Sequence, residues 1–362
     1  MGVDEAGCRA SAASLYTVAI KRDGWLWAWG HNHRGQLGDG TRQDRAAPVR
    51  IMGDVVAVSA TREHTAAIRT DSSLWLWGDN RYGKLGDGRI TTYDDDDRIL
   101  EDCNRLTPTH IMDDVVAVSA GHYHTMAIRS DSSLWGWGYN RYGQLGDGTR
   151  VDHVTPLRIM ENVRSVSAGK FNTMAIRADG SLWAWGFNKY GHLGDGTTRH
   201  QPVPVRIMDD VVAVRAGLRH TAAIRADGSL WAWGQNSYGQ LGDGTVENRT
   251  TPVRTMGSVA AVSAGGFHTA AITLDGCLWA WGNNTHGQLG DGTKVHKVTP
   301  TRIMADAASV HTGEYTTLVV STDGSLWAWG RNDFGQLSGR AAAYESTPVR
   351  VLGDADWGAS SC

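Results

Sequence analysis

A short tryptophan-containing motif recurs along the chain and restricts the fold more than any other feature. Residues 181–197 read SLWAWGFNKYGHLGDGT, and closely similar motifs occur six more times. The first tryptophan of each pair follows the previous one by 48 residues, except for one step of 60. These tryptophans are Trp27, Trp75, Trp135, Trp183, Trp231, Trp279 and Trp327. The chain is therefore a seven-fold repeat with one 12-residue insertion, and such a period is typical of solenoids and propellers.

Each repeat is predicted to form four short strands, with sequences such as DVVAVSAG, HTAAIR, SLWAWG and PVRI. Regularly spaced short strands with turn residues between them indicate an all-β fold. Pairs such as Asp179-Gly180 precede the third strand, and Asp71-Ser72 and Asp131-Ser132 take the same place in two copies. Residues of these types tolerate the positive φ of a tight hairpin turn.

The third strand is apolar on both faces, which decides between the two architectures. Alternation places Trp183 and Trp185 on one face and Leu182 and Ala184 on the other. Such a strand must be covered on both sides, and radially stacked blades achieve this. We therefore predict one domain, residues 1–362, that forms a seven-bladed β-propeller of four-stranded antiparallel blades.

The two ends of the chain align with the same strand of the repeat. Residues 8–17 align with residues 56–65, and the segment after Val351 also aligns with the start of a first strand. We expect the termini to close the ring together in one blade. Cys8 and Cys362 would then lie close enough for a disulfide, or they would remain two terminal thiols.

The insertion falls in residues 89–107, which we expect to form an acidic loop that connects two blades. It contains Asp94 to Asp97, Glu101 and Asp102. A loop of this kind is usually a solvated excursion. The functional alternative is an arm that meets a basic partner or binds calcium weakly.

Two recurring polar columns invite a catalytic or metal-binding interpretation. Each Gly-Asp-Gly turn offers one carboxylate, which is a weak calcium site, and the aspartate is expected to accept backbone N–H bonds instead. The histidine column is interpreted as a hydrogen-bonding structural element, because other residues replace it in three copies. Its members are His64, His124, His220 and His268. No metal site, catalytic residue or cofactor is predicted.

The overall composition excludes several classes of partner. A net charge of −3 provides no strong field for nucleic acid or an anionic membrane. No apolar run approaches the roughly 20 residues that span a bilayer, and the N-terminus as given lacks the features of a signal peptide. We expect a soluble monomer, cytoplasmic or secreted after processing, since the four cysteines do not settle the compartment.

Two motifs carry a resemblance to a known family. The segments GYNRYGQLGDGT (residues 138–149) and SAGHYHT (residues 119–125) resemble the regulator-of-chromosome-condensation repeat, whose members fold as seven-bladed propellers. The near-identity of the copies resembles bacterial members. Departures occur at Arg89 and at residues 336–340. The family includes exchange factors, chromatin binders, a tryptophan-based photoreceptor and enzyme inhibitors.

The resemblance helps to narrow the function. The photoreceptor class places tryptophans between the glycine and histidine of the SAGxxHT motif, and none stands there in this chain. Chromatin binding in the family's namesake is associated with a basic tail, whereas Asp4 and Glu5 stand near this N-terminus. The tryptophans of this chain are therefore expected to be structural.

The two positions before the histidine column vary from copy to copy, in the segments called here the GxxH loops. Seven such loops would form a ring on one face and mix aromatic with charged side chains, as binding surfaces do. The alternative is a set of solvent-facing turns. The predicted partner-binding residues are Arg62, Glu63, His122, Tyr123, Lys170, Phe171, Leu218, Arg219, Phe267, Glu314 and Tyr315.

Three functional hypotheses remain open. The first is a non-enzymatic scaffold that binds a protein or peptide through this face. The second is an exchange factor or enzyme inhibitor of the same family. The third is a carbohydrate-binding, hydrolytic or lyase propeller that acts at the central channel, although no familiar catalytic motif occurs.

Overall fold

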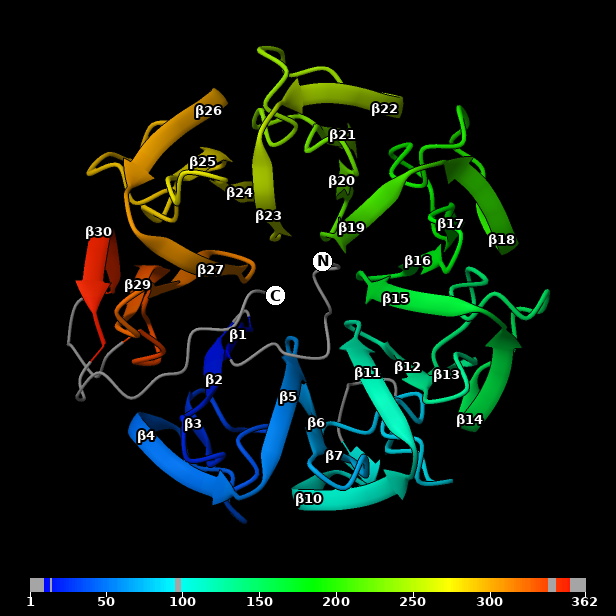
Figure 1. Ribbon diagram of the computed structural model, residues 1–362. Helices are drawn as coiled ribbons and strands as arrows, with labels where there is room; N and C mark the ends of the chain where they lie inside the picture. The colour runs from blue at the N-terminus through cyan, green and yellow to red at the C-terminus, as the bar shows by residue number, and fades with distance from the viewer. Residues whose placement is uncertain (1–9, 14, 95–98, 338–342, 352–362) are drawn as a thin grey trace.

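Seven antiparallel four-stranded sheets surround a central axis in the computed structural model, which describes residues 10–13, 15–94, 99–337 and 343–351 (Figure 1). The predicted all-β class and the seven blades are confirmed. Within these ranges there is no helix, and so none that could cross a membrane.

The first three blades occupy residues 10–160. The first blade contains β1 (Ala10–Ala12), β2 (Tyr16–Ile20), β3 (Leu26–Gly30) and β4 (Arg45–Met52). The second contains β5 (Val55–Ala60), β6 (His64–Arg69), β7 (Leu74–Gly78) and β10 (Arg105–Met112). The third contains β11 (Val115–Ala120), β12 (His124–Arg129), β13 (Leu134–Gly138) and β14 (His153–Met160).

The remaining four blades occupy residues 163–350. The fourth contains β15 (Val163–Ala168), β16 (Asn172–Arg177), β17 (Leu182–Gly186) and β18 (Gln201–Met208). The fifth contains β19 (Val211–Ala216), β20 (His220–Arg225), β21 (Leu230–Gly234) and β22 (Arg249–Met256). The sixth contains β23 (Val259–Ala264), β24 (His268–Thr273), β25 (Leu278–Gly282) and β26 (Lys297–Met304). The seventh contains β27 (Ala307–Thr312), β28 (Thr316–Ser321), β29 (Leu326–Arg331) and β30 (Tyr344–Arg350).

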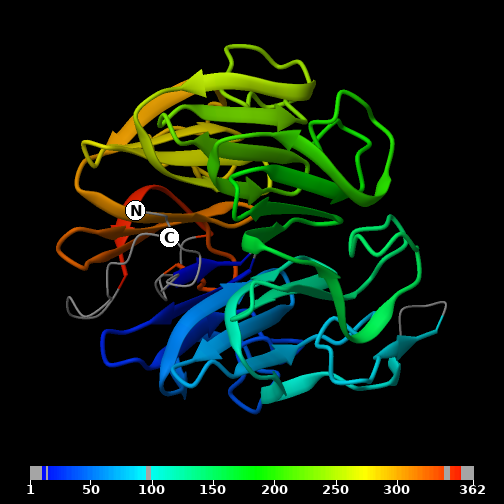
Figure 2. The ribbon, with the colours of Figure 1, turned by 45° about the vertical axis from the view of Figure 1, so that its right-hand side comes forward.

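Within a blade the chain runs outward from the axis, so the first strand lines the centre and the fourth strand forms the outer edge (Figures 1 and 2). The predicted hairpin turns are confirmed, because Gly180 has φ +81° and Ser72 has φ 64°. Each outer strand contains a proline, a residue that sheets tolerate at their edges and that discourages pairing with another chain. These prolines are Pro48, Pro108, Pro156, Pro204, Pro252, Pro300 and Pro348.

Apolar side chains fill the space between adjacent blades. Between the third and fourth blades, Met126 and Leu145 pack in one cluster with Val166 and Trp185. The second tryptophan of each pair is fully buried, as Trp185 is, whereas the first remains partly exposed. Both faces of a third strand are therefore covered, as the sequence predicted, and the blades depend on each other for their cores.

A repeated hydrogen-bonding arrangement, called here the carbonyl bridge, fixes each blade to the next. The backbone oxygen of Gln144 in the third blade accepts bonds from Thr173 Oγ1 at 2.8 Å and Trp185 Nε1 at 2.9 Å, both in the fourth blade. The accepting residues are Gln36, Lys84, Gln144, His192, Gln240, Gln288 and Gln336. Because the acceptor is a backbone oxygen, the bridge itself does not depend on the side chain at this column.

The ring closes through the same bridge. The oxygen of Gln336 in the seventh blade accepts bonds from Thr17 Oγ1 at 2.8 Å and Trp29 Nε1 at 2.9 Å in the first. Strand β1, near the N-terminus, takes the first-strand position of the first blade and contacts β27 and β28. The strand expected after Val351 and the cysteines Cys8 and Cys362 lie outside the described residues, so their pairing stays a prediction.

We expected the acidic segment 89–107 to connect two blades, but this expectation was wrong. It joins β7 to β10, which pair with each other inside the second blade. The segment contains a small hairpin of β8 (Thr92–Tyr93) and β9 (Ile99–Glu101). At its base, Asn104 Oδ1 accepts bonds from the backbone N–H of Asn80 and from Thr91 Oγ1. Residues 95–98 lie outside the described residues.

Candidate partner-binding face

The Gly-Asp-Gly turns are structural elements. Asn140 Oδ1 accepts the backbone N–H of Leu145 at 2.9 Å, and its Nδ2 donates to Asp147 Oδ1 at 2.9 Å. Asp147 also accepts the backbone N–H of Thr149 at 3.0 Å. Burial acts to raise the pKa of Asp147, but the hydrogen bond from the Thr149 hydroxyl, together with those from the Thr149 N–H and Asn140, outweighs it and lowers the pKa. The predicted structural role of the aspartate is confirmed, and the asparagine stabilises the same turn.

The histidine column also serves the fold. His220 Nε2 lies 2.9 Å from Thr269 Oγ1 of the next blade, and Thr269 donates its hydroxyl to the oxygen of Gln240. Since the hydroxyl proton is used there, His220 must donate its Nε2–H to Thr269. Burial lowers the pKa of His220 to about 4, so the ring is neutral at pH 7. The hydrogen-bonding interpretation of this column is confirmed.

The first variable position of the GxxH loops lies at the mouth of the central channel. His122, Lys170, Leu218 and Glu314 line one cavity there, of about 100 Å³. The structure thus brings together loops that are far apart in sequence. Burial lowers the pKa of Lys170, Arg219 lowers it further, and Glu314 acts in the opposite direction.

The second variable position carries aromatic rings that contact each other between blades. Tyr123 and Phe171 are stacked, with ring centroids 5.0 Å apart and an interplanar angle of 9°. Phe171 also contacts Tyr142 edge-on at 5.3 Å, and Tyr142 contacts Phe187 at 4.9 Å. These half-buried rings form a continuous strip of aromatic contacts on the face that carries the GxxH loops.

Arg219 extends this strip across the fifth blade. Its guanidinium carbon lies 4.9 Å from the ring centroid of Tyr190 and 5.9 Å from that of Phe267. Phe267 in turn lies 6.1 Å from Tyr315. We call the whole set the aromatic band: Tyr82, Tyr123, Tyr139, Tyr142, Phe171, Phe187, Tyr190, Arg219, Tyr238, Phe267 and Tyr315.

About half of the aromatic band was missed by the sequence analysis. Tyr139 and Phe187 directly follow the third strand of their blades. Four tyrosines stand two positions after the turn asparagine that corresponds to Asn140 in each repeat. Those four are Tyr82, Tyr142, Tyr190 and Tyr238. These tyrosines could have been recognised in the sequence, because an aromatic residue recurs inside a motif otherwise made of glycine and polar residues.

Two predicted residues in the second blade have different surroundings. Glu63 Oε2 lies 3.8 Å from Nζ of the fully buried Lys84, which pairs at 2.5 Å with Asp79. Glu63 therefore contributes to a partly buried ion-pair network. Arg62 is exposed and does not line the cavity at the channel mouth.

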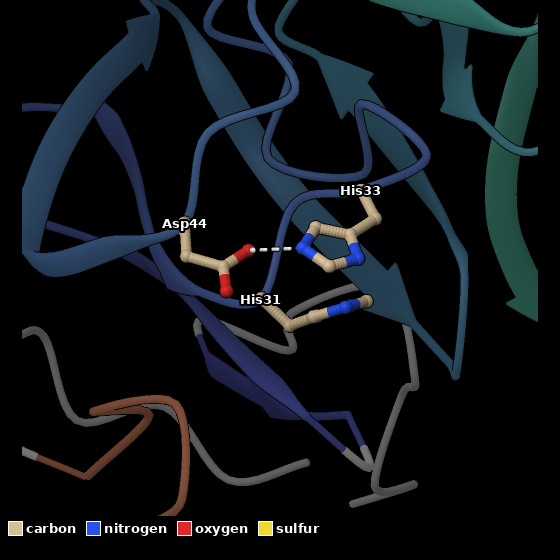
Figure 3. A group of neighbouring side chains, drawn as sticks. All are labelled: His31, His33 and Asp44. Atoms are coloured by element: carbon tan, nitrogen blue, oxygen red, sulfur yellow. Dashed lines mark ion pairs between the residues drawn. The ribbon is translucent and has the colours of Figure 1, made fainter.

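Figure 3 shows His31, His33 and Asp44, whose potential ligand atoms lie within 4.8 Å of one another. The backbone N–H of Arg34 donates to Gln36 Oε1, so the amide presents Nε2–H to His31 Nδ1 at 2.8 Å. The neutral His31 ring then carries its proton on Nε2. A metal ion needs a ring nitrogen with a free lone pair, so binding there would break this hydrogen bond. We assign the cluster to loop packing.

Comparison with known proteins places the chain in a family. Residues 3–255 and residues 158–360 each match the profile of the RCC1-like domain. The chain belongs to the RCC1-like domain family. This agrees with the repeat family that the SAGxxHT and GQLGDGT motifs resemble.

Sequence relatives of this RCC1-like chain match only part of it. The ultraviolet-B receptor UVR8 of Arabidopsis thaliana is 30% identical over 146 residues, which are 39% of this chain and 31% of that protein. The probable E3 ubiquitin-protein ligase HERC6 of Homo sapiens is 50% identical over 34 residues, or 9% of this chain and 3% of that protein. The chain thus matches less than a third of the length of either relative.

Two solved structures share the fold over most of the chain. Yeast RCC1 (Prp20), in a complex with Kap60, aligns with a TM-score of 0.80 at 19% identity and covers 96% of this chain and 88% of its own. Human WBSCR16 aligns with a TM-score of 0.74 at 23% identity, over 84% of this chain and 83% of the WBSCR16 chain. At these identities the likeness establishes the fold alone.

Proposed function

We propose that this RCC1-like propeller is a non-enzymatic scaffold that binds a protein or peptide partner through the face carrying the GxxH loops. The observation that carries the proposal is the aromatic band. It places preorganised tyrosine, phenylalanine and arginine side chains beside the charged channel mouth. A few residues supply most of the binding energy at protein interfaces, and tyrosine and arginine are enriched among them.

The pattern of variation supports the same face. The columns that recur in every repeat are used in turns, carbonyl bridges and cores, as Asn140, Trp185 and Thr173 show. The GxxH loops change from blade to blade while their backbone positions repeat. A single face can therefore present one specific combination of side chains without cost to the fold.

The structural relatives are consistent with partner binding. One solved structure contains yeast RCC1 (Prp20) bound to Kap60, and another describes binding of Prp20p to Gsp1p and histones. An exchange factor or an enzyme inhibitor would be a specialised form of the role proposed here. We extend the proposal to a monomer, a bacterial-type member and a protein partner instead of nucleic acid or membrane.

The test is a combined variant of the band, with Tyr123, Phe171, Arg219, Phe267 and Tyr315 each changed to alanine. Affinity capture from lysate of the source organism, quantified by mass spectrometry, should recover a partner with the wild-type chain and lose it with the variant. The thermal melting transition of the variant serves as the folding control. A second control changes the exposed outer-strand residues Arg158, Arg206 and Arg254 to alanine and should retain the partner.

Two outcomes would contradict the proposal. If the band variant retains its partner at wild-type levels, the partner binds elsewhere. If the wild-type chain instead binds sugars on a glycan array or shows turnover in a hydrolase panel, the carbohydrate-binding or enzymatic role at the channel is favoured.

A further inference from the structure

Five cationic side chains gather on the face that carries the GxxH loops. Arg62, Lys170 and Arg219 belong to these loops, whereas Arg141 and Lys189 each directly precede a tyrosine of the aromatic band. Across the ranges that the structure describes, none of the five forms an ion pair with a carboxylate. The face therefore presents positive charge that ion pairs within the fold do not neutralise.

Arginines at the opposite end of the blades are paired within the folded chain. Arg129 and Arg225 end their second strands, on the side away from the GxxH loops. Arg129 Nη2 lies 2.6 Å from Asp114 Oδ2, and Arg225 Nη2 lies 2.8 Å from Asp210 Oδ2. The repeat thus places a carboxylate beside these cations and none in ion-pair contact with the five on the GxxH face. At protein interfaces, charge of this kind is complemented by opposite charge on the partner.

The cations at the channel mouth are close enough to act on one another. Burial lowers the pKa of Lys170, and the charges of Arg219 and Arg62 lower it further, whereas Glu314 acts in the opposite direction. Burial also lowers the pKa of His122 to about 3, and Lys170 and Arg62 add to that shift. Positive charge therefore dominates at both residues, and a carboxylate brought to the mouth by a partner would relieve the repulsion among these cations.

Arg219 is held by rings that leave its hydrogen-bond donors available. Its guanidinium carbon lies 4.9 Å from the ring centroid of Tyr190 and 5.9 Å from that of Phe267. Lys170 Nζ similarly lies 5.3 Å from the ring centroid of Phe171. These cation–π contacts position the charges, while the N–H groups of a guanidinium can still bind a carboxylate through two parallel hydrogen bonds.

We propose that the aromatic band binds an acidic segment of the partner protein, whose aspartate or glutamate side chains pair with Lys170 and Arg219. Apolar side chains of the same segment pack against the rings. The inference rests on the proposed function and specifies the chemistry of the partner. Arg141, Lys170, Lys189 and Arg219 lie in the third, fourth and fifth blades, which also carry most of the rings, so the segment crosses these three blades.

Nucleic acid is the other common polyanion, and two carboxylates on this face disfavour it. Glu63 and Glu314 stand in the GxxH loops among the cations. A nucleic acid presents a phosphate at every step of its backbone, so it would meet these carboxylates as well as the cations. A peptide carries its charges only at selected positions and can place neutral residues beside Glu63 and Glu314.

The test begins with a random dodecapeptide library displayed on phage and selected on the wild-type chain. The enriched peptides should be net negative, with apolar residues between the acidic ones. Fluorescence anisotropy then measures the affinity of one enriched peptide, labelled with fluorescein, for the wild type and for the Lys170→Gln/Arg219→Gln variant. Binding to the variant should be weaker by roughly 10-fold or more, and added salt should weaken binding to the wild type.

A matched control removes two cations elsewhere. The Arg206→Gln/Arg254→Gln variant alters the outer strands β18 and β22 and should bind the peptide as the wild type does. The Lys170→Gln/Arg219→Gln variant should melt at the wild-type temperature or above, because its two loop positions vary between blades and Lys170 is repelled by its neighbours. Equal affinity of the wild type and both variants for the peptide would overturn the proposal.

The remaining outcomes separate this inference from the proposed function. Enrichment of neutral or basic peptides, or of no peptide, would overturn the acidic segment. Tighter binding of a labelled oligothymidylate than of the acidic peptide would also overturn it and favour nucleic acid. None of these results decides whether the face binds a protein, because loss of a captured partner in the alanine variant of the aromatic band does not depend on the partner's charge.

Discussion

Lys84 Nζ lies 2.5 Å from Asp79 Oδ2 inside the second blade, with the side chains of both residues almost completely buried. In the sixth blade the corresponding positions hold Gln288 and Asn283, whose Nε2 and Oδ1 atoms are 2.7 Å apart. One site of the repeat is thus filled either by an ion pair or by a neutral amide pair. The two solutions can be exchanged experimentally.

Replacing one residue of the ion pair should lower the free energy of unfolding strongly, whereas replacing both residues together should not. We predict that Asp79→Asn or Lys84→Gln alone lowers the free energy of unfolding by roughly 3 kcal/mol, because each removes the nearest opposite charge from a buried ionised group. The Asp79→Asn/Lys84→Gln double variant should return to within about 1 kcal/mol of the wild type. Chemical denaturation of the four proteins checks this cycle, and additive effects of the two substitutions would refute it.

The carbonyl bridge predicts a second stability effect. Thr269→Val removes the hydroxyl that bonds to the oxygen of Gln240 and accepts from His220 Nε2. The free energy of unfolding should fall by roughly 1–3 kcal/mol, since a buried donor is left unsatisfied. Thr299→Val, an exposed position on β26, is the control and should change stability by less than about 0.5 kcal/mol. Equal effects at the two sites would argue against the bridge.

The buried histidines predict a loss of stability in mild acid. Burial lowers the pKa of His220 to about 4 and that of His268 to about 3, so below pH 6.5 the unfolded chain binds protons that the folded chain does not. Stability from these neutral rings is complete above the unfolded pKa and falls as pH drops from about 6.5 toward 4.

The contribution of one of these histidines can be measured by replacing it with the residue that another blade has at the same column. His220→Asn places at this column the residue found at Asn172. Between pH 6.5 and 5, the slope of the unfolding free energy against pH should decrease by up to about 1.4 kcal/mol per pH unit. Urea denaturation at several pH values measures the slope. An unchanged slope would show that His220 is protonated in the folded protein.

The fold could be predicted from the sequence because the side chains that recur in each repeat require it. Paired tryptophans require cover on both faces, and Asp179-Gly180 marks a hairpin turn. The carbonyl bridge could not be predicted in this way. Its acceptor is a backbone oxygen at a column occupied by residues as different as Gln144, Lys84 and His192, and side chains do not indicate which backbone oxygen accepts a bond.

The acidic insertion was predicted to lie between two blades, and this prediction was wrong. The loop after β7 reaches over to the next blade, where Gly88 N–H donates to the oxygen of Val154 at 3.0 Å, before the chain returns to β10. Only the pairing of β10 with β7 shows that it belongs to one blade.

The candidate face was predicted in part. The GxxH loops stood out because their residues vary, and the structure brings Lys170 and Glu314 to one cavity. The tyrosines of the aromatic band were overlooked because they lie inside the motif that builds the turn. Tyr142 is an example, since its neighbours Asn140 and Gly143 have structural roles.

Site-specific photocrosslinking tests the central claim most directly. A photoreactive phenylalanine analogue at position 171 lies in the aromatic band, whereas the same analogue at Val203 lies on an exposed outer strand of the same blade. Irradiation in lysate of the source organism should give a covalent adduct with one protein partner from position 171 and none from position 203. An adduct that forms from position 203 and not from position 171 would contradict the account.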